Sequence, residues 1–396
     1  MILSSSGSKI DGERKMKKIV FWLPCYPDVM YSFIEELARR EGNDITVVCL
    51  SDLPPERRGI YKQDALAEIC DIIVCDEEIA SSDAVKKILS ENADAIHIFG
   101  GFLGRVGEVL TYYHDGGYKR AVVVTEKPSI TPTKHFKGVI KLIKKVRSKK
   151  IYKNRYERIK DAVAAVFVTG QAGVNQLLSY GIPKEKLFKF MYTHIEENAA
   201  PREISDNKTV RFVYVGRFNY LNRGMDALMY AFDKVKYTNW QLDLVGGYGE
   251  DSEEIIEWAN SRERVSFIGS WQNNEVISRL ADYDVCISPT RIDGWRIQVN
   301  QAIMAGIGTI TTNEAISDEL VVASRSGIVV NANKKRELKH AVESVLEHPE
   351  TVSLWKKNAR AYAHKITNPA FVDYFVRCIE YIFNDNKNEE MPECPF

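Results

Sequence analysis

The sequence of 396 residues contains no run of 18 or more apolar residues, although 45% of its residues are hydrophobic. A helix needs roughly 20 such residues to cross a bilayer, so no transmembrane anchor is predicted. The first residues, MILSSSGSKIDGERKMKK, lack the apolar core and small-residue cleavage site of a secretory signal. We therefore expect residues 1–16 to form a flexible tail, and we expect a cytoplasmic protein.

Cysteine is scarce, and the spacing of the cysteines argues against both a disulfide framework and a metal site. The seven cysteines are an odd number, lie far apart and include no CxxC pair. Such spacing favours neither a disulfide framework nor a metal site. We expect reduced and mostly buried thiols at positions 25, 49, 70, 75, 286, 378 and 394.

Net charge is also lacking, because 54 basic residues balance 54 acidic ones. The charges are not evenly distributed along the chain. Residues 134–160 carry twelve Lys or Arg against one acidic residue, Glu157. No stacking aromatics or known nucleic-acid fold accompany these charges, so no nucleic-acid partner is expected. Apolar residues recur there at helical spacing: Phe136, Val139, Ile140, Ile143 and Val146.

A basic amphipathic helix of this kind can lie on an anionic membrane surface. The alternative is a helix packed on its own domain with a solvated lysine face, and the sequence leaves both open. Membrane contact through residues 134–160 would place the protein at the inner face of the cytoplasmic membrane.

Short β-branched and aromatic segments alternate with amphipathic segments throughout the chain. In the first half they are KIVFWLP, DITVVCL, DIIVCD, AIHIFG and AVVVTE, and in the second VRFVYVG, QLDLVGG, VSFIG, DVCISPT and GTITT. Strands separated by helical crossovers are typical of parallel sheets covered on both faces. The pattern predicts two Rossmann-like α/β domains, joined near residues 196–209.

The predicted boundaries are an N-terminal domain at 17–197, a C-terminal domain at 198–366, a helix at 367–384 and a polar tail at 385–396. The helix carries an apolar stripe at helical spacing, which must pack on another surface. We expect it to return to the N-terminal domain. The stripe comprises Phe371, Tyr374, Phe375, Cys378, Ile379 and Ile382.

Charged and flexible residues follow the strands of the second half. Arg217 and Arg223 follow VRFVYVG, and Asp293 and Gly294 follow DVCISPT. Ligands of parallel α/β sheets bind at the carboxyl ends of the strands. Two guanidinium groups there can bind a diphosphate, and a turn before a helix can bring backbone amides close to it. Solvated loop arginines and an empty Asp-Gly turn are the alternatives.

The succession GRFNYLNRG, LDLVGGYGE, RVSFIGSW, LADYDVCISPT, DGWRIQVNQAIMAG and SGIVV resembles the C-terminal domain of family-4 retaining glycosyltransferases over about 130 residues. The resemblance implies a GT-B fold, in which two Rossmann-like domains face each other across a cleft. It also implies a retaining transfer of sugar from a UDP or GDP donor to an acceptor hydroxyl. The implied acceptor is a saccharide or a lipid-linked precursor of a surface polysaccharide, and neither cofactor nor metal is expected.

The resemblance assigns catalytic roles to Arg217, Arg223, Asp293 and Glu126, although for Glu126 a strand-end glutamate paired with a nearby lysine is the alternative. Two departures are visible: Gln301 replaces a glutamate that holds the ribose, and Arg296 replaces a glycine. The implied donor-binding residues are Gly216, Gly246, Gly247, Ile268, Gly294, Trp295, Arg296, Ile297 and Gln301. The expected acceptor side comprises His97, Gly100, Gly101 and Lys127, although a histidine satisfied in the core is the alternative for His97.

Three other interpretations remain at this point. Asp282 and Asp284 have the spacing of a metal-chelating pair, but they precede a strand, so we interpret them as structural. A GT-B nucleotide-sugar epimerase would consume a donor without an acceptor. A catalytically inactive GT-B binding protein would explain the departures at Arg296 and Gln301.

Overall fold

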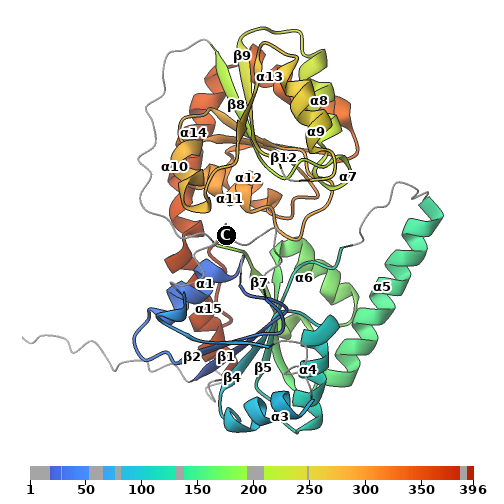
Figure 1. Ribbon diagram of the computed structural model, residues 1–396, viewed down its shortest axis with the longest axis vertical. Coiled ribbons are helices and arrows are strands. Elements are labelled where there is room, and N and C mark those ends of the chain that lie inside the picture. Colours follow the sequence, from blue (N-terminus) through green and yellow to red (C-terminus); the bar gives the residue numbers. More distant parts are fainter. Residues whose placement is uncertain are drawn as a thin grey trace, which may run out of the picture.

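The computed structural model describes residues 18–27, 29–52, 66–75, 82–129, 138–193, 209–247, 249–383 and 390–396. The predicted tail at 1–16 and most of the predicted linker lie outside these ranges. Two parallel-sheet domains follow each other along the chain, and Figure 1 shows them as separate lobes. The prediction of two Rossmann-like domains is confirmed.

The N-terminal domain is built on a seven-stranded parallel sheet with the order β3-β2-β1-β4-β5-β6-β7. Its strands are fully buried in the centre, as expected for a sheet with helices on both faces. Its elements are β1 (Ile19–Leu23), α1 (Tyr31–Ala38), β2 (Ile45–Cys49), β3 (Asp71–Val74), α3 (Ser82–Glu91), β4 (Ile96–Phe99), α4 (Gly104–Asp115), β5 (Ala121–Thr125), α5 (Gly138–Ile159), β6 (Val163–Thr169), α6 (Gly170–Ser179) and β7 (Leu187–Phe190).

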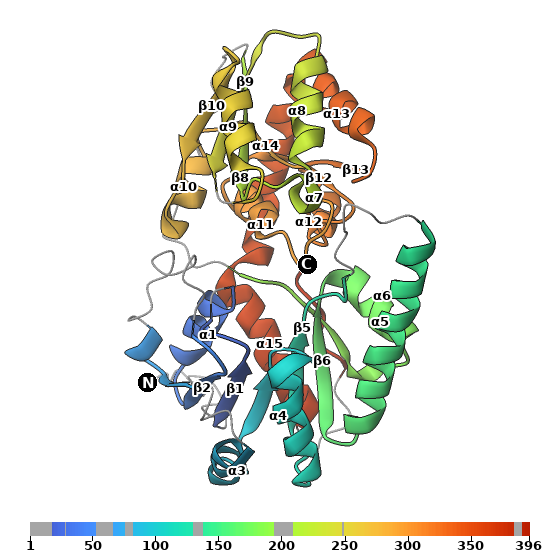
Figure 2. The same cartoon turned by 45° about the vertical axis from the view of Figure 1, so that its right-hand side comes forward.

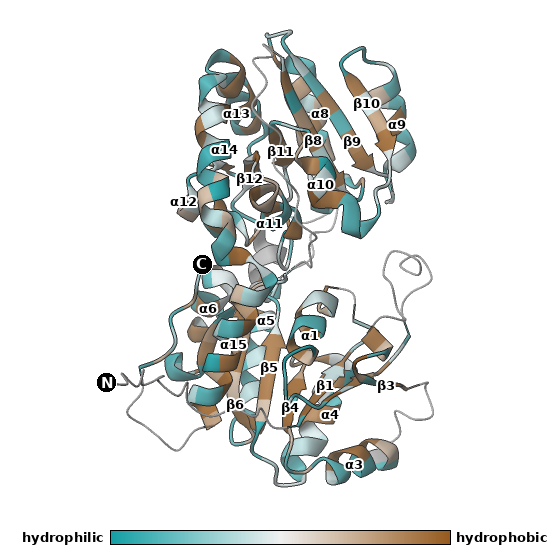
Figure 3. Cartoon of the chain, turned by 90° about the vertical axis from the view of Figure 1, so that its left-hand side faces the viewer, coloured by the Kyte–Doolittle hydropathy of each residue, from teal (hydrophilic) through white to brown (hydrophobic). Residues whose placement is uncertain are grey.

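The C-terminal domain has a six-stranded parallel sheet with the order β10-β9-β8-β11-β12-β13. The strands are coloured mainly hydrophobic in Figure 3, whereas the outer helices have mixed colours. Its elements are β8 (Val210–Gly216), α7 (Tyr220–Arg223), α8 (Met225–Lys234), β9 (Trp240–Gly246), α9 (Ser252–Asn260), β10 (Val265–Gly269), α10 (Val276–Leu280), β11 (Val285–Ser288), α11 (Ile297–Met304), β12 (Gly308–Thr312), α12 (Asp318–Ser324), β13 (Gly327–Val330), α13 (Lys335–Glu347) and α14 (Glu350–Ala363).

The last helix, α15 (Asn368–Phe383), leaves the C-terminal domain and lies beside α1 in the N-terminal domain, as Figure 2 shows. The ring of Phe375 packs 4.9 Å from that of Phe33 and 4.7 Å from that of Phe167. Arg40 of the N-terminal domain also forms an ion pair with Asp373. The apolar stripe of α15 thus completes the N-terminal core.

The end of the chain differs from the predicted polar tail. The C-terminus lies where the two domains meet, and the Phe396 ring packs 5.8 Å from Trp295 and 6.2 Å from Phe371. Lys189 Nζ lies 4.3 Å from the centre of the same ring. These ring contacts of Phe396, which is half-buried, offset part of the entropy cost of ordering the end of the chain.

Two further features concern the predicted thiols and the membrane. The described cysteines form no disulfide, and five of them are buried: Cys49, Cys70, Cys75, Cys286 and Cys378. Within the described ranges, no helix has the length and apolar character needed to cross a bilayer.

We expect Phe375→Ala to destabilise the N-terminal domain by about 3–5 kcal/mol, because truncating a buried aromatic leaves a cavity. Urea unfolding followed by circular dichroism measures the loss. Leu354→Ala, at a side chain that is 56% exposed on α14, is the control and should change stability by less than about 0.5 kcal/mol. Equal effects of the two changes would contradict the packing of α15 described above.

Candidate active site

A cavity of about 760 Å³ lies between the carboxyl ends of the two sheets. Such edges expose helix N-termini and loop amides, which is why parallel α/β sheets bind ligands there. The N-terminal domain contributes Pro24, Cys25, Tyr26, Gly100, Thr125, Glu126 and Tyr192, among others, and the C-terminal domain contributes Gly216, Arg217, Arg223, Gly246, Ser270, Trp271, Asn273, Asp293, Trp295, Arg296, Ile297 and Gln301.

Arg223 reaches the cavity from the end of α7, a single helical turn. Asn219 caps this turn by accepting a hydrogen bond of 2.8 Å from the Asn222 amide. Gly224 ends it with φ of 65°, and a Cβ there would lie 2.1 Å from the Pro289 carbonyl oxygen, so glycine is required. The turn thereby directs Arg223 onto Asp293, with which it forms an ion pair.

Both partners of this pair are 14% exposed at their side chains. Asp293 Oδ1 also accepts a hydrogen bond of 3.0 Å from the Gly294 amide, which fixes the turn after β11. Arg217 lines the same cavity from the loop after β8. The two arginines and the carboxylate therefore come together as the sequence predicted.

Arg296 forms the floor of the cavity and is 3% exposed. Its Nε donates to Ser288 Oγ over 2.7 Å, and its Nη2 donates to the Val215 carbonyl oxygen over 2.7 Å. Burial, followed by the nearby charge of Arg223, lowers the pKa of its guanidinium. The side chain points beneath the strand ends of β8 and β11, where it lies beside the other charged groups.

Glu126 faces these groups from the end of β5 in the other domain. Its Oε1 accepts a hydrogen bond of 3.1 Å from the Tyr192 hydroxyl. A Cβ at Gly294 would lie 1.9 Å from Glu126 Oε2, so a larger residue there would push the Glu126 carboxylate from this position. Thr169 Oγ1 holds the loop after β11 by donating to the Gly294 carbonyl oxygen over 2.8 Å.

Gln301 lies in the second turn of α11, on the cavity wall, and is 2% exposed. Its Oε1 is buried and has no hydrogen-bond partner among the described residues. An unpaired buried acceptor costs free energy unless a ligand supplies a donor. The side chain can therefore accept from a hydroxyl group of a bound molecule.

The remaining predicted residues divide into two groups. Gly216, Gly246, Trp295, Ile297 and Gly100 line the cavity. Lys127 instead forms an ion pair of 3.7 Å with Glu314, and Ile268 lies on the edge strand β10, 45% exposed. Gly247 and Gly101 are not among the residues that line the cavity. A Cβ at Gly247 would contact the Phe267 ring, and a Cβ at Gly101 would contact nothing.

The acceptor-side prediction for His97 is wrong, because its side chain is fully buried within the core of the N-terminal domain. Trp22 Nε1 donates to its Nδ1 over 3.0 Å, and its Nε2 lies 2.9 Å from the Asn92 carbonyl oxygen. Strand β4 alternates its side chains between two covered faces, so a polar residue in mid-strand points into the core rather than to the strand end. Burial lowers the pKa of His97 to about 4.

Sequence reasoning missed Tyr192 and the group of Ser270, Trp271 and Asn273, which also line the cavity. Tyr192 follows β7, so the strand-end rule could have found it. The other three follow β10, where a register shift between Phe267 and Gly269 moves the lining from Ile268 to the next residues.

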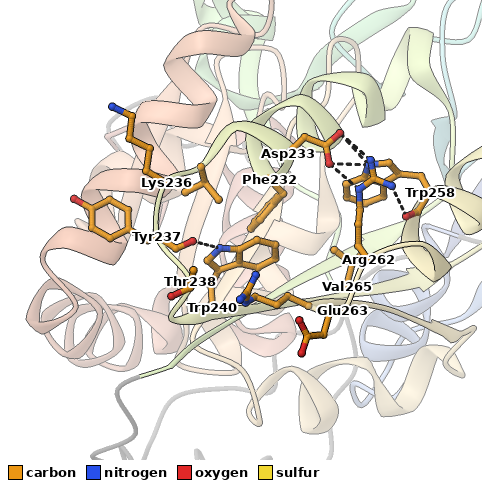
Figure 4. A pocket seen from close by; sticks show the side chains of 12 residues that line it. Phe232, Asp233, Lys236, Tyr237, Thr238, Trp240, Trp258, Arg262, Glu263 and Val265 are labelled. Atoms are coloured by element: carbon orange, nitrogen blue, oxygen red, sulfur yellow. Dashed lines mark hydrogen bonds and ion pairs between the residues drawn. The ribbon is translucent and has the colours of Figure 1, made fainter.

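A second, smaller hollow of about 290 Å³ lies in the C-terminal domain, and Figure 4 shows the side chains that line it. Trp240 and Val265, which begin β9 and β10, line it. The guanidinium of Arg262 lies 4.8 Å from the Trp258 ring and that of Arg264 6.0 Å from the Trp240 ring. These contacts cover the indole faces, and the hollow shares no residue with the cavity.

In the described part of the chain, no three His, Cys, Asp or Glu side chains gather as a metal site. Asp284, which the sequence suggested as structural, accepts from Lys356 Nζ over 2.5 Å and from the Arg211 amide over 2.9 Å. These contacts join α14 and β8 to β11 at the sheet end away from the cavity.

Comparison with known proteins assigns the class of the chain. Residues 209–348 match the family model described as "Glycosyl transferases group 1". An uncharacterized 41.2 kDa protein in the cps region of Klebsiella pneumoniae is 22% identical over 293 residues, which cover 70% of this chain and 75% of that protein.

Solved structures share the fold. WaaG, a glycosyltransferase involved in lipopolysaccharide biosynthesis, superposes with a TM-score of 0.61 at 15% identity, over 92% of this chain and 100% of that one. HepE from Anabaena, in complex with UDP and glucose, gives 0.65 at 14% identity, over 91% and 98%. The fold is therefore GT-B, and the chain is a glycosyltransferase.

The buried His97 predicts a specific dependence of stability on pH. Its pKa of about 4 lies below the ordinary 6.5, so the unfolded chain takes up this proton first as the pH falls. Neutral His97 therefore makes its full contribution to the free energy of unfolding above about pH 6.5. This contribution decreases by roughly 3 kcal/mol as the pH falls toward 4. We expect the stability advantage of the wild type over His97→Gln to shrink between about pH 7 and pH 4.5.

Urea unfolding at several pH values measures this difference. His348→Gln, at an exposed histidine with a side-chain exposure of 62%, is the control and should follow the wild type throughout. An advantage that stays constant with pH would show that His97 titrates normally.

Proposed function

We propose that this chain is a retaining glycosyltransferase that moves a sugar from a UDP or GDP donor to an acceptor hydroxyl. The observation that supports this most directly is the convergence of Arg217, Arg223 and Asp293 at one edge of the C-terminal sheet. Opposite them stands Glu126 of the other domain. The group 1 family match covers the same domain.

In this proposal, the arginines bind the diphosphate and stabilise it as the bond to the sugar breaks. Charge-assisted hydrogen bonds strengthen as negative charge develops on the leaving group. The anomeric carbon acquires oxocarbenium character, and the acceptor oxygen attacks from the face that the diphosphate leaves. The acceptor proton passes to a diphosphate oxygen, so the configuration at the anomeric carbon is retained.

The other cavity residues have complementary roles in the proposal. Asp293 orients Arg223 and accepts hydrogen bonds from sugar hydroxyls. The unpaired Gln301 Oε1 accepts from a ribose hydroxyl. Glu126, positioned by the Tyr192 hydroxyl, faces the anomeric centre and stabilises its positive charge. No metal or cofactor takes part.

The acceptor side is the part of the cavity formed by Pro24, Cys25, Tyr26 and Gly100. We propose a saccharide acceptor, carried on a lipid or belonging to a surface-polysaccharide precursor. The relative from the cps region and the lipopolysaccharide enzyme support this acceptor class.

Helix α5 supports a membrane-bound acceptor. Near its end, Tyr156 and Ile159 are buried and Tyr152 packs 6.1 Å from the Phe102 ring. A helix turns by about 100° per residue, so Ile143 and Val146 lie away from this packed face. They are 60% and 61% exposed.

The start of α5 projects beyond the body of the N-terminal domain in Figure 1. Exposed basic residues surround its two aliphatic side chains, namely Lys144, Arg147, Lys149 and Lys150. Aliphatic side chains can insert among lipid chains while lysines contact anionic headgroups. We therefore propose that this part of α5 binds an anionic membrane surface, at the inner face of the cytoplasmic membrane.

A thermal-shift screen of UDP-, GDP-, ADP- and dTDP-sugars identifies the donor, because a ligand stabilises the folded state that binds it. With that donor, we expect Arg217→Ala to reduce transfer by roughly 100- to 1,000-fold while circular dichroism stays unchanged. The acceptor-dependent release of nucleoside diphosphate measures transfer. Donor conversion without an acceptor would instead indicate an epimerase, and donor binding without any turnover would indicate an inactive binding protein.

For the membrane contact, we expect Ile143→Glu with Val146→Glu to weaken binding to vesicles of phosphatidylglycerol at least about tenfold, because two inserted side chains become charged. Co-sedimentation measures binding, with phosphatidylcholine vesicles as the neutral comparison. Leu354→Glu, at an exposed leucine of α14, is the matched control. Equal binding of all three proteins, or no preference for the anionic lipid, would refute the contact.

A further inference from the structure

Arg296 is a buried cation whose direct hydrogen bonds go to uncharged groups. It is 3% exposed, and its partners are the Ser288 hydroxyl and the Val215 carbonyl, both at 2.7 Å. Burying a charge without a counterion costs several kcal/mol. A site that retains such a cation is suited to an anionic ligand.

The nearby carboxylate does not supply that counterion by itself. Asp293 Oδ2 lies 3.9 Å from Arg296 Nη1, beyond hydrogen-bond distance. The same oxygen is bonded to Arg223. One carboxylate is thus shared by two guanidinium groups, and a third, that of Arg217, lines the same cavity.

The position of the guanidinium indicates which anion it can reach. A Cβ at Gly216 would lie 2.8 Å from Arg296 Nη2 and 3.2 Å from Nη1. Gly216 ends β8, directly before Arg217, so Arg296 lies under the same strand end. The three arginines outnumber the two carboxylates of the cavity, Asp293 and Glu126, so the site keeps a net positive charge that suits the anionic oxygens of a diphosphate diester.

We infer that Arg296 is a third diphosphate-binding arginine, which holds an anionic oxygen of the nucleoside diphosphate from the floor of the cavity. This inference rests on the proposed function. The carboxylate of an acidic donor sugar has the same chemistry, but the place of Arg296 beside Gly216 and Arg223 favours the diphosphate. On cleavage, the leaving group gains charge, and Arg296 stabilises it together with Arg217 and Arg223.

The test compares the affinities of the wild type and Arg296→Met for a nucleoside diphosphate and for the nucleoside alone. UDP with uridine and GDP with guanosine are the probes, and the pair that the wild type binds is used. Calorimetry measures the diphosphate and ligand-observed NMR the nucleoside. We expect Arg296→Met to weaken diphosphate binding roughly 10- to 100-fold, the loss of a charged hydrogen bond, and to leave nucleoside binding unchanged.

Arg296→Lys should retain part of the diphosphate affinity, since it keeps the charge but not the planar donors. Leu354→Ala, at an exposed leucine of α14 away from the cavity, is the control and should leave diphosphate binding unchanged. Should Arg296→Met fail to fold by circular dichroism, Arg296→Gln replaces it, because its amide can still donate to Val215.

Two results would overturn the inference. In the first, Arg296→Met weakens diphosphate and nucleoside binding by the same factor, or weakens neither. Either outcome is expected if Arg296 has only a structural role. In the other, binding of UDP and UDP-glucose is unchanged while that of UDP-glucuronic acid falls. Arg217→Ala and Arg223→Ala in the same assay separate the two proposals: if they also leave diphosphate binding unchanged, the proposed function itself fails.

Discussion

Positive charge held at the carboxyl ends of one parallel sheet is the constraint on which the site depends. Arg217, Arg223 and Arg296 reach the same cavity from the loops after β8 and β11, and Asp293 balances only part of their charge. Guanidinium groups repel each other when few counterions are present, so rigid neighbours must hold them in place. The α7 turn, the Ser288 hydroxyl and the Val215 carbonyl do this, and the cavity is thereby prepared for an anion.

The contact between the domains depends on the same loop. Gly294 brings it against Glu126, and Thr169 and Asn300 connect it and α11 to the N-terminal domain through hydrogen bonds of 2.8 and 3.2 Å. Helix α15 returns to the N-terminal core, and Phe396 packs beside Trp295 of the loop after β11. Movement of one domain would therefore change the cavity walls directly, which suits an enzyme that must exclude water while a reactive sugar is transferred.

Much of the fold could be predicted because the signals are local. The strands from β1 to β5 and from β8 to β12 occur where apolar β-branched segments predicted them, and strand ends pointed to Arg217, Arg223 and Asp293. The same reasoning failed at His97, because sequence position in a strand does not say which polar side chain is satisfied in the core. It failed in part at Ile268, where a bulge in β10 displaced the lining to Ser270 and Trp271.

The sequence alone determined the two parallel-sheet domains, the returning helix and the placement of basic residues after strands, since periodicity and strand ends are encoded by neighbouring residues. The tertiary structure alone decided that Arg296 lies buried under β8, that Glu126 meets Gly294 across the domains and that Phe396 packs between them. These contacts join residues far apart in the chain. Their geometry follows from how whole sheets and helices pack, and no short stretch of sequence carries that information.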